Sequence, residues 1–127
     1  MGLNPGDIYS IKDSVIDFPE TRAGQARSPH PTRPVLLLSN ARICTDRIEP
    51  VVLVAPLSHL TELKTACDLF IKADDLNRLA CNSRLILGHA QPVLKSDLLG
   101  KVGSFSSGDF DRVKAHMIWM LGLDDEE

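Results

Sequence analysis

Two short, unbroken aliphatic runs constrain the fold of this chain more than any other feature. Residues 35–38 (VLLL) and 51–55 (VVLVA) contain no polar side chain. Runs of this length are too short for a core helix and are typical of strands that are buried on both faces. Pro34 suits the first position of its strand, because proline cannot donate a hydrogen bond to a neighbouring strand. Pro56 would end the second strand or place it near an edge.

Weaker signals indicate further strands around these two runs. Gly6-Asp7 marks a turn before an expected strand over residues 8–11. More strands are expected over residues 68–72 and 83–89, and residues 92–94 continue as an extended segment. The other expected elements are a polar turn over 40–50, a short helix capped by Asp74 or Asp75 that reaches residue 79, and one helical turn over 96–99.

The last expected element is an amphipathic helix near the C-terminus. Residues 106–109 (SSGD) match a capping box with Asp109 at the third helical position. Apolar residues then recur at spacings of three and four until Gly122, which is expected to stop the helix. Strands first and one helix last predict a mainly β fold, a small twisted sheet or barrel with a C-terminal helix. The expected core stripe consists of Phe110, Val113, Met117 and Met120, widened by Trp119 and Leu121.

The length and charge of the chain bound its organisation. Its 127 residues suffice for one domain with a hydrophobic core but not for two, and we expect a single domain over residues 1–123. The four acidic residues at 124–127 form a tail that we expect to be disordered. The net charge is −3, and without the four charges of this tail the body carries +1. A polyanionic partner is therefore compatible with the sequence.

Basic charge gathers in one stretch of the chain. Residues 13–32 contain three prolines and a glycine and are expected to form a long loop. Residues 21–45 contain no Asp or Glu and four arginines. This pattern indicates a phosphate-binding surface, with a solvated arginine-rich loop as the alternative for each single arginine. The four are Arg22, Arg27, Arg33 and Arg42.

The cysteines and histidines indicate neither a disulfide framework nor a metal site. The three cysteines are odd in number and widely spaced, and the four histidines are scattered, so no metal-ligand spacing is present and no cofactor is expected. Free thiols fit a reducing cytoplasm. The sequence has no apolar N-terminal signal core and no run near the ~20 apolar residues of a membrane span, so no membrane partner is expected. The residues concerned are Cys44, Cys67, Cys81, His30, His59, His89 and His116.

A set of segments in a fixed order carries a resemblance to a known family: residues 6–9 (GDIY), 33–40 (RPVLLLSN) and 52–58 (VLVAPLS), extended by 83–87, 98–103 and 120–123. Together they resemble the PemK/MazF toxins of bacterial toxin–antitoxin systems. The resemblance implies an SH3-like barrel of the PemK/MazF/CcdB type that assembles as a homodimer. It also implies a sequence-selective, metal-independent endoribonuclease that cleaves single-stranded RNA, mRNA in particular, and is inhibited by a cognate antitoxin protein.

The resemblance assigns catalytic roles to two residues of this chain. Arg33 matches the catalytic arginine of the family's Arg-Pro pair. Ser58 stands where the family has a threonine, so the hydroxyl is kept and a methyl group is lost. The chain departs from the family at residues 88–91 (GHAQ), where many members carry an acidic residue and a glutamine. Here the acidic group is missing and His89 takes the place of the glutamine.

Cleavage through the ribose 2′-hydroxyl defines what these residues would have to do. RNA carries this nucleophile itself, and the reaction needs a base for the 2′-OH, an acid for the leaving 5′-oxygen and a positive donor at phosphorus. A guanidinium such as that of Arg33 binds phosphate oxygens through two parallel N–H bonds. His89 is the first candidate for the proton carrier and His59 the second. The candidate RNA-binding residues are Arg22, Arg27, His30, Arg42 and Gln91.

Purely structural roles for these residues and non-catalytic functions for the protein stay open. Arg33 could be a solvated strand-end arginine, and His89 a half-buried histidine without chemistry. Residues 118–123 (IWMLGL) loosely resemble the aromatic-glycine end of CcdB-like toxins, which share the fold and bind DNA gyrase without cutting RNA. The change at Gly88-His89 also allows a degenerate paralogue that binds RNA or an antitoxin without catalysis.

Overall fold

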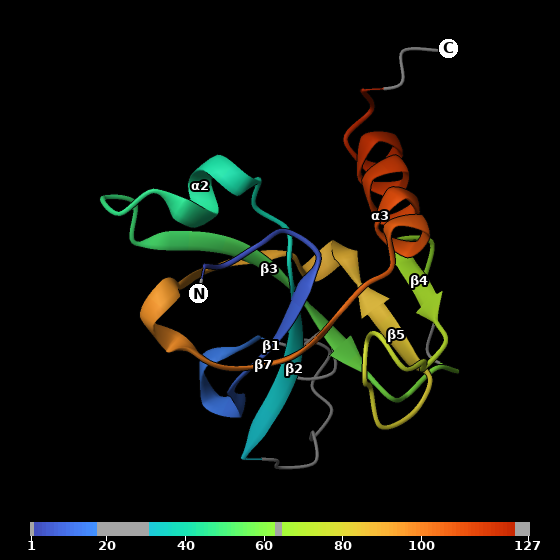
Figure 1. The fold of residues 1–127 in the computed structure, drawn as a ribbon. Helices are drawn as coiled ribbons and strands as arrows, with labels where there is room; N and C mark the ends of the chain where they lie inside the picture. The colour runs from blue at the N-terminus through green and yellow to red at the C-terminus, as the bar shows by residue number, and fades with distance from the viewer. Residues whose placement is uncertain (1, 18–30, 63–64, 124–127) are drawn as a thin grey trace.

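The computed structural model describes residues 2–17, 31–62 and 65–123 (Figure 1). Arg22, Arg27 and His30 lie outside these ranges, as does the acidic tail at 124–127. Their expected roles therefore stay predictions.

The described residues form a seven-stranded sheet with two α-helices. No helix in this part of the chain combines the length and the apolar character that a membrane crossing requires. The strands are β1 (Asp7–Lys12), β2 (Thr32–Leu37), β3 (Val51–Ser58), β4 (Asp68–Ile71), β5 (Ser83–Ile86), β6 (Gln91–Leu94) and β7 (Leu98–Ser104). The helices are α2 (Ala41–Thr45) and α3 (Ser107–Met120), and the 3-10 turns are η1 (Asp13–Val15), η2 (Leu87–His89) and η3 (Lys95–Asp97).

The sheet is antiparallel and coils into a barrel-like body, with α3 beside β4 and β5 (Figure 1). Its strand order is β4-β5-β3-β2-β1-β7, and β6 also pairs with β3. β3 is the hub, because its first half pairs with β6 and its last two residues pair with β5. β2 pairs with the middle of the same strand. The predicted mainly β fold with a C-terminal helix is confirmed.

The aliphatic runs supply two buried clusters. In β2, Val35 and Leu37 pack in one cluster, and Leu36 packs in the other. Successive strand residues point to opposite faces, so a strand with core on both sides needs an unbroken apolar sequence. For β3 the prediction is only partly right. Both faces are buried from Ala55 onward, but Leu53 is exposed, because its face is not covered there.

The two prolines lie where β2 and β3 separate. Pro34 is the third residue of β2 rather than the first, and β3 runs through Pro56 instead of ending there. Pairing between the two strands stops at Val35 and Pro56, and the strands diverge beyond that pair (Figure 1). Because proline cannot donate to a ladder, these residues mark the point at which the ladder ends.

Two expected elements between β4 and β6 differ in the structure. Residues 74–79 form turns and no helix. Oδ1 of Asp74 accepts hydrogen bonds from the N–H groups of Leu76 and Asn77, as in a helix cap, but the chain does not continue into a helix. The fifth strand is shorter than expected, since β5 ends at Ile86 and the chain continues as η2.

Three further elements were placed inaccurately or missed. The expected polar turn over 40–50 contains α2, whose N-cap Asn40 accepts a hydrogen bond from the N–H of Ile43 at 2.9 Å. The helical turn expected over 96–99 is η3, one residue earlier. β7 was not predicted, because its sequence, with glycines at 100 and 103 and a lysine at 101, lacks an apolar alternation.

The predicted capping of α3 is confirmed, and its predicted core stripe is partly wrong. Oγ of Ser106 accepts a hydrogen bond from the N–H of Asp109 at 3.1 Å. Trp119 is 52% exposed and Leu121 is exposed too, since neither falls on the buried face at 3.6 residues per turn. The stripe that packs on the core is Phe110, Val113, Met117 and Met120.

Side chains of α3 also tie the helix to the β4 side of the sheet. Arg112 donates to the carbonyl of Phe70 at 3.2 Å. Nε2 of His116 donates to the carbonyl of Ala66 at 2.8 Å, and the His116 ring lies against Trp119 with ring centroids 5.2 Å apart.

The thiols of Cys44 and Cys81 should differ in reactivity. Cys44 is buried and its Sγ donates to the carbonyl of Ser39 at 3.2 Å, while Cys81 is exposed. Burial raises the pKa of the Cys44 thiol, which lowers its thiolate fraction at any given pH, and the thiolate is the reactive form. We expect iodoacetamide at pH 8 to label Cys81 in the native protein and Cys44 only in urea, as read by peptide mass spectrometry. Equal labelling of both in the native protein would contradict this.

Candidate functional site

A pocket of about 170 Å³ opens where the ends of β2 and β3 diverge. We call it the β2–β3 pocket. Its lining comes from the start of β2, the end of β3 and the connection between β4 and β5. The lining residues are Thr32, Arg33, Pro34, Leu57, His59, Leu79, Ala80, Cys81 and Ser83.

Arg33 is the one arginine in the lining of this pocket, and an acidic side chain holds it. The residue is only 9% exposed, and its Nε–H donates to Oδ1 of Asp13 in an ion pair. Asp13 follows β1 directly, and β1 pairs with β2 so that Ile11 lies opposite Arg33. The N–H of Asp13 also donates to the carbonyl of Pro31 at 3.2 Å. The hairpin register therefore fixes both the carboxylate and the guanidinium.

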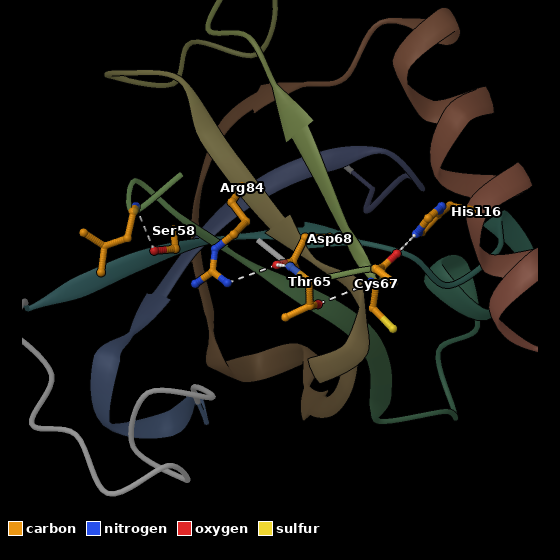
Figure 2. Close-up of polar contacts among 8 residues, drawn as sticks. Ser58, Thr65, Cys67, Asp68, Arg84 and His116 are labelled. Atoms are coloured by element: carbon orange, nitrogen blue, oxygen red, sulfur yellow. Dashed lines mark hydrogen bonds and ion pairs between the residues drawn. The ribbon is translucent and has the colours of Figure 1, made fainter. Parts of the chain in front are cut away.

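Ser58 lies next to the pocket but does not line it. Its neighbours Leu57 and His59 are lining residues, and alternate residues of a strand point to opposite faces. Ser58 is buried, and its Oγ accepts a hydrogen bond from the N–H of Leu60 at 3.2 Å. In the sheet it pairs with Arg84 of β5, and Figure 2 shows the two side chains beside one another.

A buried ion pair behind Ser58 was not predicted from the sequence. Nη1 of Arg84 lies 3.0 Å from Oδ2 of Asp68, and their side chains are 3% and 1% exposed. The same carboxylate oxygen accepts from the N–H of Thr65 at 2.9 Å (Figure 2). An arginine next to the apolar run of residues 85–87 is an available sequence signal, because a charge buried in such a strand needs a partner from a neighbouring strand.

Of the two candidate proton carriers, His59 lines the same pocket as Arg33, and His89 does not. His59 is exposed and lines the β2–β3 pocket. His89 is half-buried in η2 and lines a separate, more open hollow of about 380 Å³ with Asp17 and residues 88–91.

The two described candidates for RNA binding also lie apart from the β2–β3 pocket. The side-chain amide of Gln91 is bonded to backbone groups: it accepts from the N–H of Asp17 at 2.9 Å and donates to the carbonyls of Asp17 and His89 at 3.1 and 2.9 Å. Arg42 is exposed on α2, which follows the opposite end of β2 from Arg33 (Figure 1).

The described residues contain no group of three or more His, Cys, Asp or Glu side chains that could hold a metal ion.

The same arrangement of strands and helix is found in a solved structure. The chain is similar to an endoribonuclease in complex with its cognate antitoxin from mycobacterial species, with a TM-score of 0.62 and 15% sequence identity over 94% of this chain and 93% of that chain. At this identity the likeness shows a shared fold.

The sequence itself identifies the family. Residues 5–121 match the model of the PemK-like, MazF-like toxins of type II toxin–antitoxin systems, so the chain belongs to this family. The resemblance noted from the sequence is thereby confirmed. A comparison with curated proteins found no match.

The Arg84–Asp68 ion pair should be a strong determinant of stability. Asp68→Asn keeps the shape but removes the carboxylate charge from a buried ion pair, and breaking such a pair typically costs about 3–5 kcal/mol. We expect a loss of that size in the free energy of unfolding in urea, and partial recovery in the double variant Arg84→Met/Asp68→Leu. Asp111→Asn is the control, because its ion pair with Lys114 is solvent-exposed and should contribute little. An equally small effect of Asp68→Asn would contradict the assignment.

Proposed function

We propose that this protein is a sequence-selective endoribonuclease toxin that cleaves single-stranded RNA through attack of the ribose 2′-hydroxyl, without a metal ion. The observation that carries the proposal is Arg33: a nearly buried guanidinium, oriented by Asp13, in a pocket that also contains His59. Membership of the toxin family supports it, as does the shared fold with a solved endoribonuclease.

The reaction needs few groups from the protein. A base removes the proton of the 2′-OH, and the 2′-oxygen bonds to the adjacent phosphorus. The bond from phosphorus to the 5′-oxygen then breaks, and an acid returns a proton to that oxygen. The products are a 2′,3′-cyclic phosphate and a free 5′-hydroxyl. Arg33 stabilises the extra negative charge on phosphorus, because a guanidinium stays charged and donates two parallel N–H bonds to phosphate oxygens.

We assign the proton transfers to the histidines and a supporting role to the serine. The shared pocket favours His59 over His89 as the first proton carrier, and His89 remains the candidate for the second transfer. Ser58 supplies a buried hydroxyl at the point where β3 ends, and its bond to the N–H of Leu60 shapes the turn that carries His59. We keep Arg22, Arg27, His30, Arg42 and Gln91 as proposed RNA-binding residues.

We further propose a cytoplasmic homodimer that a cognate antitoxin inhibits. The support for an antitoxin is the toxin–antitoxin family and the solved relative in fold, which was determined with its own antitoxin. An acidic antitoxin segment would compete with RNA for the same basic groups, since carboxylates and phosphates suit the same guanidinium.

Removal of Arg33 should abolish cleavage and leave the fold intact. For Arg33→Ala, we expect a loss of about 10²-fold or more in kcat/KM on single-stranded RNA, the size typical of a lost transition-state donor. The control is Arg47→Ala, an exposed arginine that follows α2, beyond the end of β2 opposite to Arg33. The assay is run in EDTA, in which the wild type should keep cutting. Full activity of Arg33→Ala, or inhibition by EDTA, would overturn the corresponding part of the proposal.

The pH dependence of cleavage should identify the proton carrier. If His59 acts as acid or base, His59→Asn removes one limb of the pH–rate profile and lowers the rate by about 10²–10⁴-fold. His89→Asn should remove the other limb if it performs the second transfer. A His116→Asn variant is the control, because that histidine is bonded to the carbonyl of Ala66. Unchanged profiles in both test variants would exclude the histidines from proton transfer.

A further inference from the structure

Part of the wall of the β2–β3 pocket is built by the connection between β4 and β5. Leu79, Ala80 and Cys81 form this wall, and Figure 1 shows the yellow-green connection next to the end of β3. Together with Pro34 and Leu57, the wall gives the pocket mainly apolar sides. The site therefore consists of the Arg33–Asp13 ion pair together with this apolar wall.

This connection is fixed from within by a buried amide. Asn77 has no exposed surface. Its Oδ1 accepts from the N–H groups of Asp74 and Leu79, both at 3.0 Å, and its Nδ2 donates to the carbonyl of Lys72 at 2.9 Å. The bond to the N–H of Leu79 attaches the first wall residue directly to the buried anchor. Ala73 and Asn82 close the two ends of the connection, because the N–H of Ala73 donates to the Asn82 side chain at 2.9 Å.

The connection is also docked on the bare backbone of β7. A Cβ atom on Gly103 would lie 2.4 Å from the carbonyl oxygen of Asn77 and 2.7 Å from that of Leu76, so no other residue fits there without displacing the connection. The N–H of Ser104 donates to the carbonyl of Leu76 at 3.0 Å. A position on β7, which is not among the residues lining the pocket, thus sets where the pocket wall stands.

We propose that this wall is a specificity-determining subsite that takes one unpaired RNA base beside the phosphate bound by Arg33. The inference rests on the proposed function. Phosphate contacts position an RNA but carry no sequence information, and single-stranded RNA is read by bases that are splayed out into pockets. Apolar walls suit the faces of a base, and the polar side chains of Thr32 and His59 lie in the same pocket to meet its edge. A wall held by a buried amide and a glycine is preformed, which lowers the cost of binding.

The test separates the subsite from the catalytic proposal. Binding of the four ribonucleoside 3′-monophosphates and of inorganic phosphate to the wild-type protein is measured by calorimetry. We expect a spread of about tenfold or more in Kd among the four bases, the size that one lost or gained polar contact gives. Ala80→Leu, which adds bulk to the wall from an exposed position, should remove this spread. Gly100→Ala, outside the pocket lining, is the control and should keep both the spread and the binding of inorganic phosphate.

A second arm uses cleavage of a random single-stranded RNA pool, with sequencing of the 5′ ends. Gly103→Ala should broaden the preference at one nucleotide next to the cut by about tenfold or more. Gly100→Ala is the matched control on the same strand, because a Cβ there meets nothing within 4 Å. If Gly103→Ala fails to fold, Ala80→Leu in the same pool replaces it.

The outcomes distinguish the two proposals. Base-dependent binding without any cleavage would end the catalytic proposal and keep the subsite. Equal binding of all four nucleotides, or cut-site preferences unchanged in Ala80→Leu, would overturn the subsite even if RNA is cut.

Discussion

The fold depends on one strand, β3, that pairs with three others. β6 and β5 follow one another along it, and β2 pairs with its middle. β2 can stay with β3 only as far as Val35 and Pro56, because beyond this pair β3 turns toward β5. The space that opens between the separating strands is the β2–β3 pocket. Its place is therefore a consequence of how the barrel coils, and Pro34 and Pro56 mark the border in the sequence.

Two arginines flank the end of β3, and each is held by an acid from a neighbouring part of the sheet. The Arg84–Asp68 pair is almost wholly buried, so desolvation is large and only a good geometry with further hydrogen bonds offsets it. The Arg33–Asp13 pair reaches the pocket and is more exposed. The first pair joins β4 and β5, and the second holds the Arg33 guanidinium at the β2–β3 pocket. The same chemistry thus has a structural role on one face of the strand ends and the proposed catalytic role on the other.

The sequence allowed the local features to be predicted and left most long-range pairs out of reach. Unbroken aliphatic runs predict strands that are buried on both faces, and Ser106 with Asp109 predicts the start of α3. Both signals lie within a few neighbouring residues. The partners of Arg33 and Arg84 are 20 and 16 residues away, and only the strand register brings them into contact. The same holds for Gly103, whose lack of a side chain matters solely because Asn77 docks there. The sequence placed His89 before His59 as candidate proton carrier, whereas His59 and not His89 lines the pocket with Arg33, since this depends on where β3 and β5 end.

The contacts of α3 with the β4 side of the sheet have a consequence for self-association. β4 is the last strand in the order of the sheet, and an open strand edge invites pairing with another chain. Arg112 occupies the carbonyl of Phe70, and His116 occupies that of Ala66 just before the strand. The helix therefore occupies part of the β4 edge, which leaves fewer carbonyl groups there for a strand of another chain to pair with.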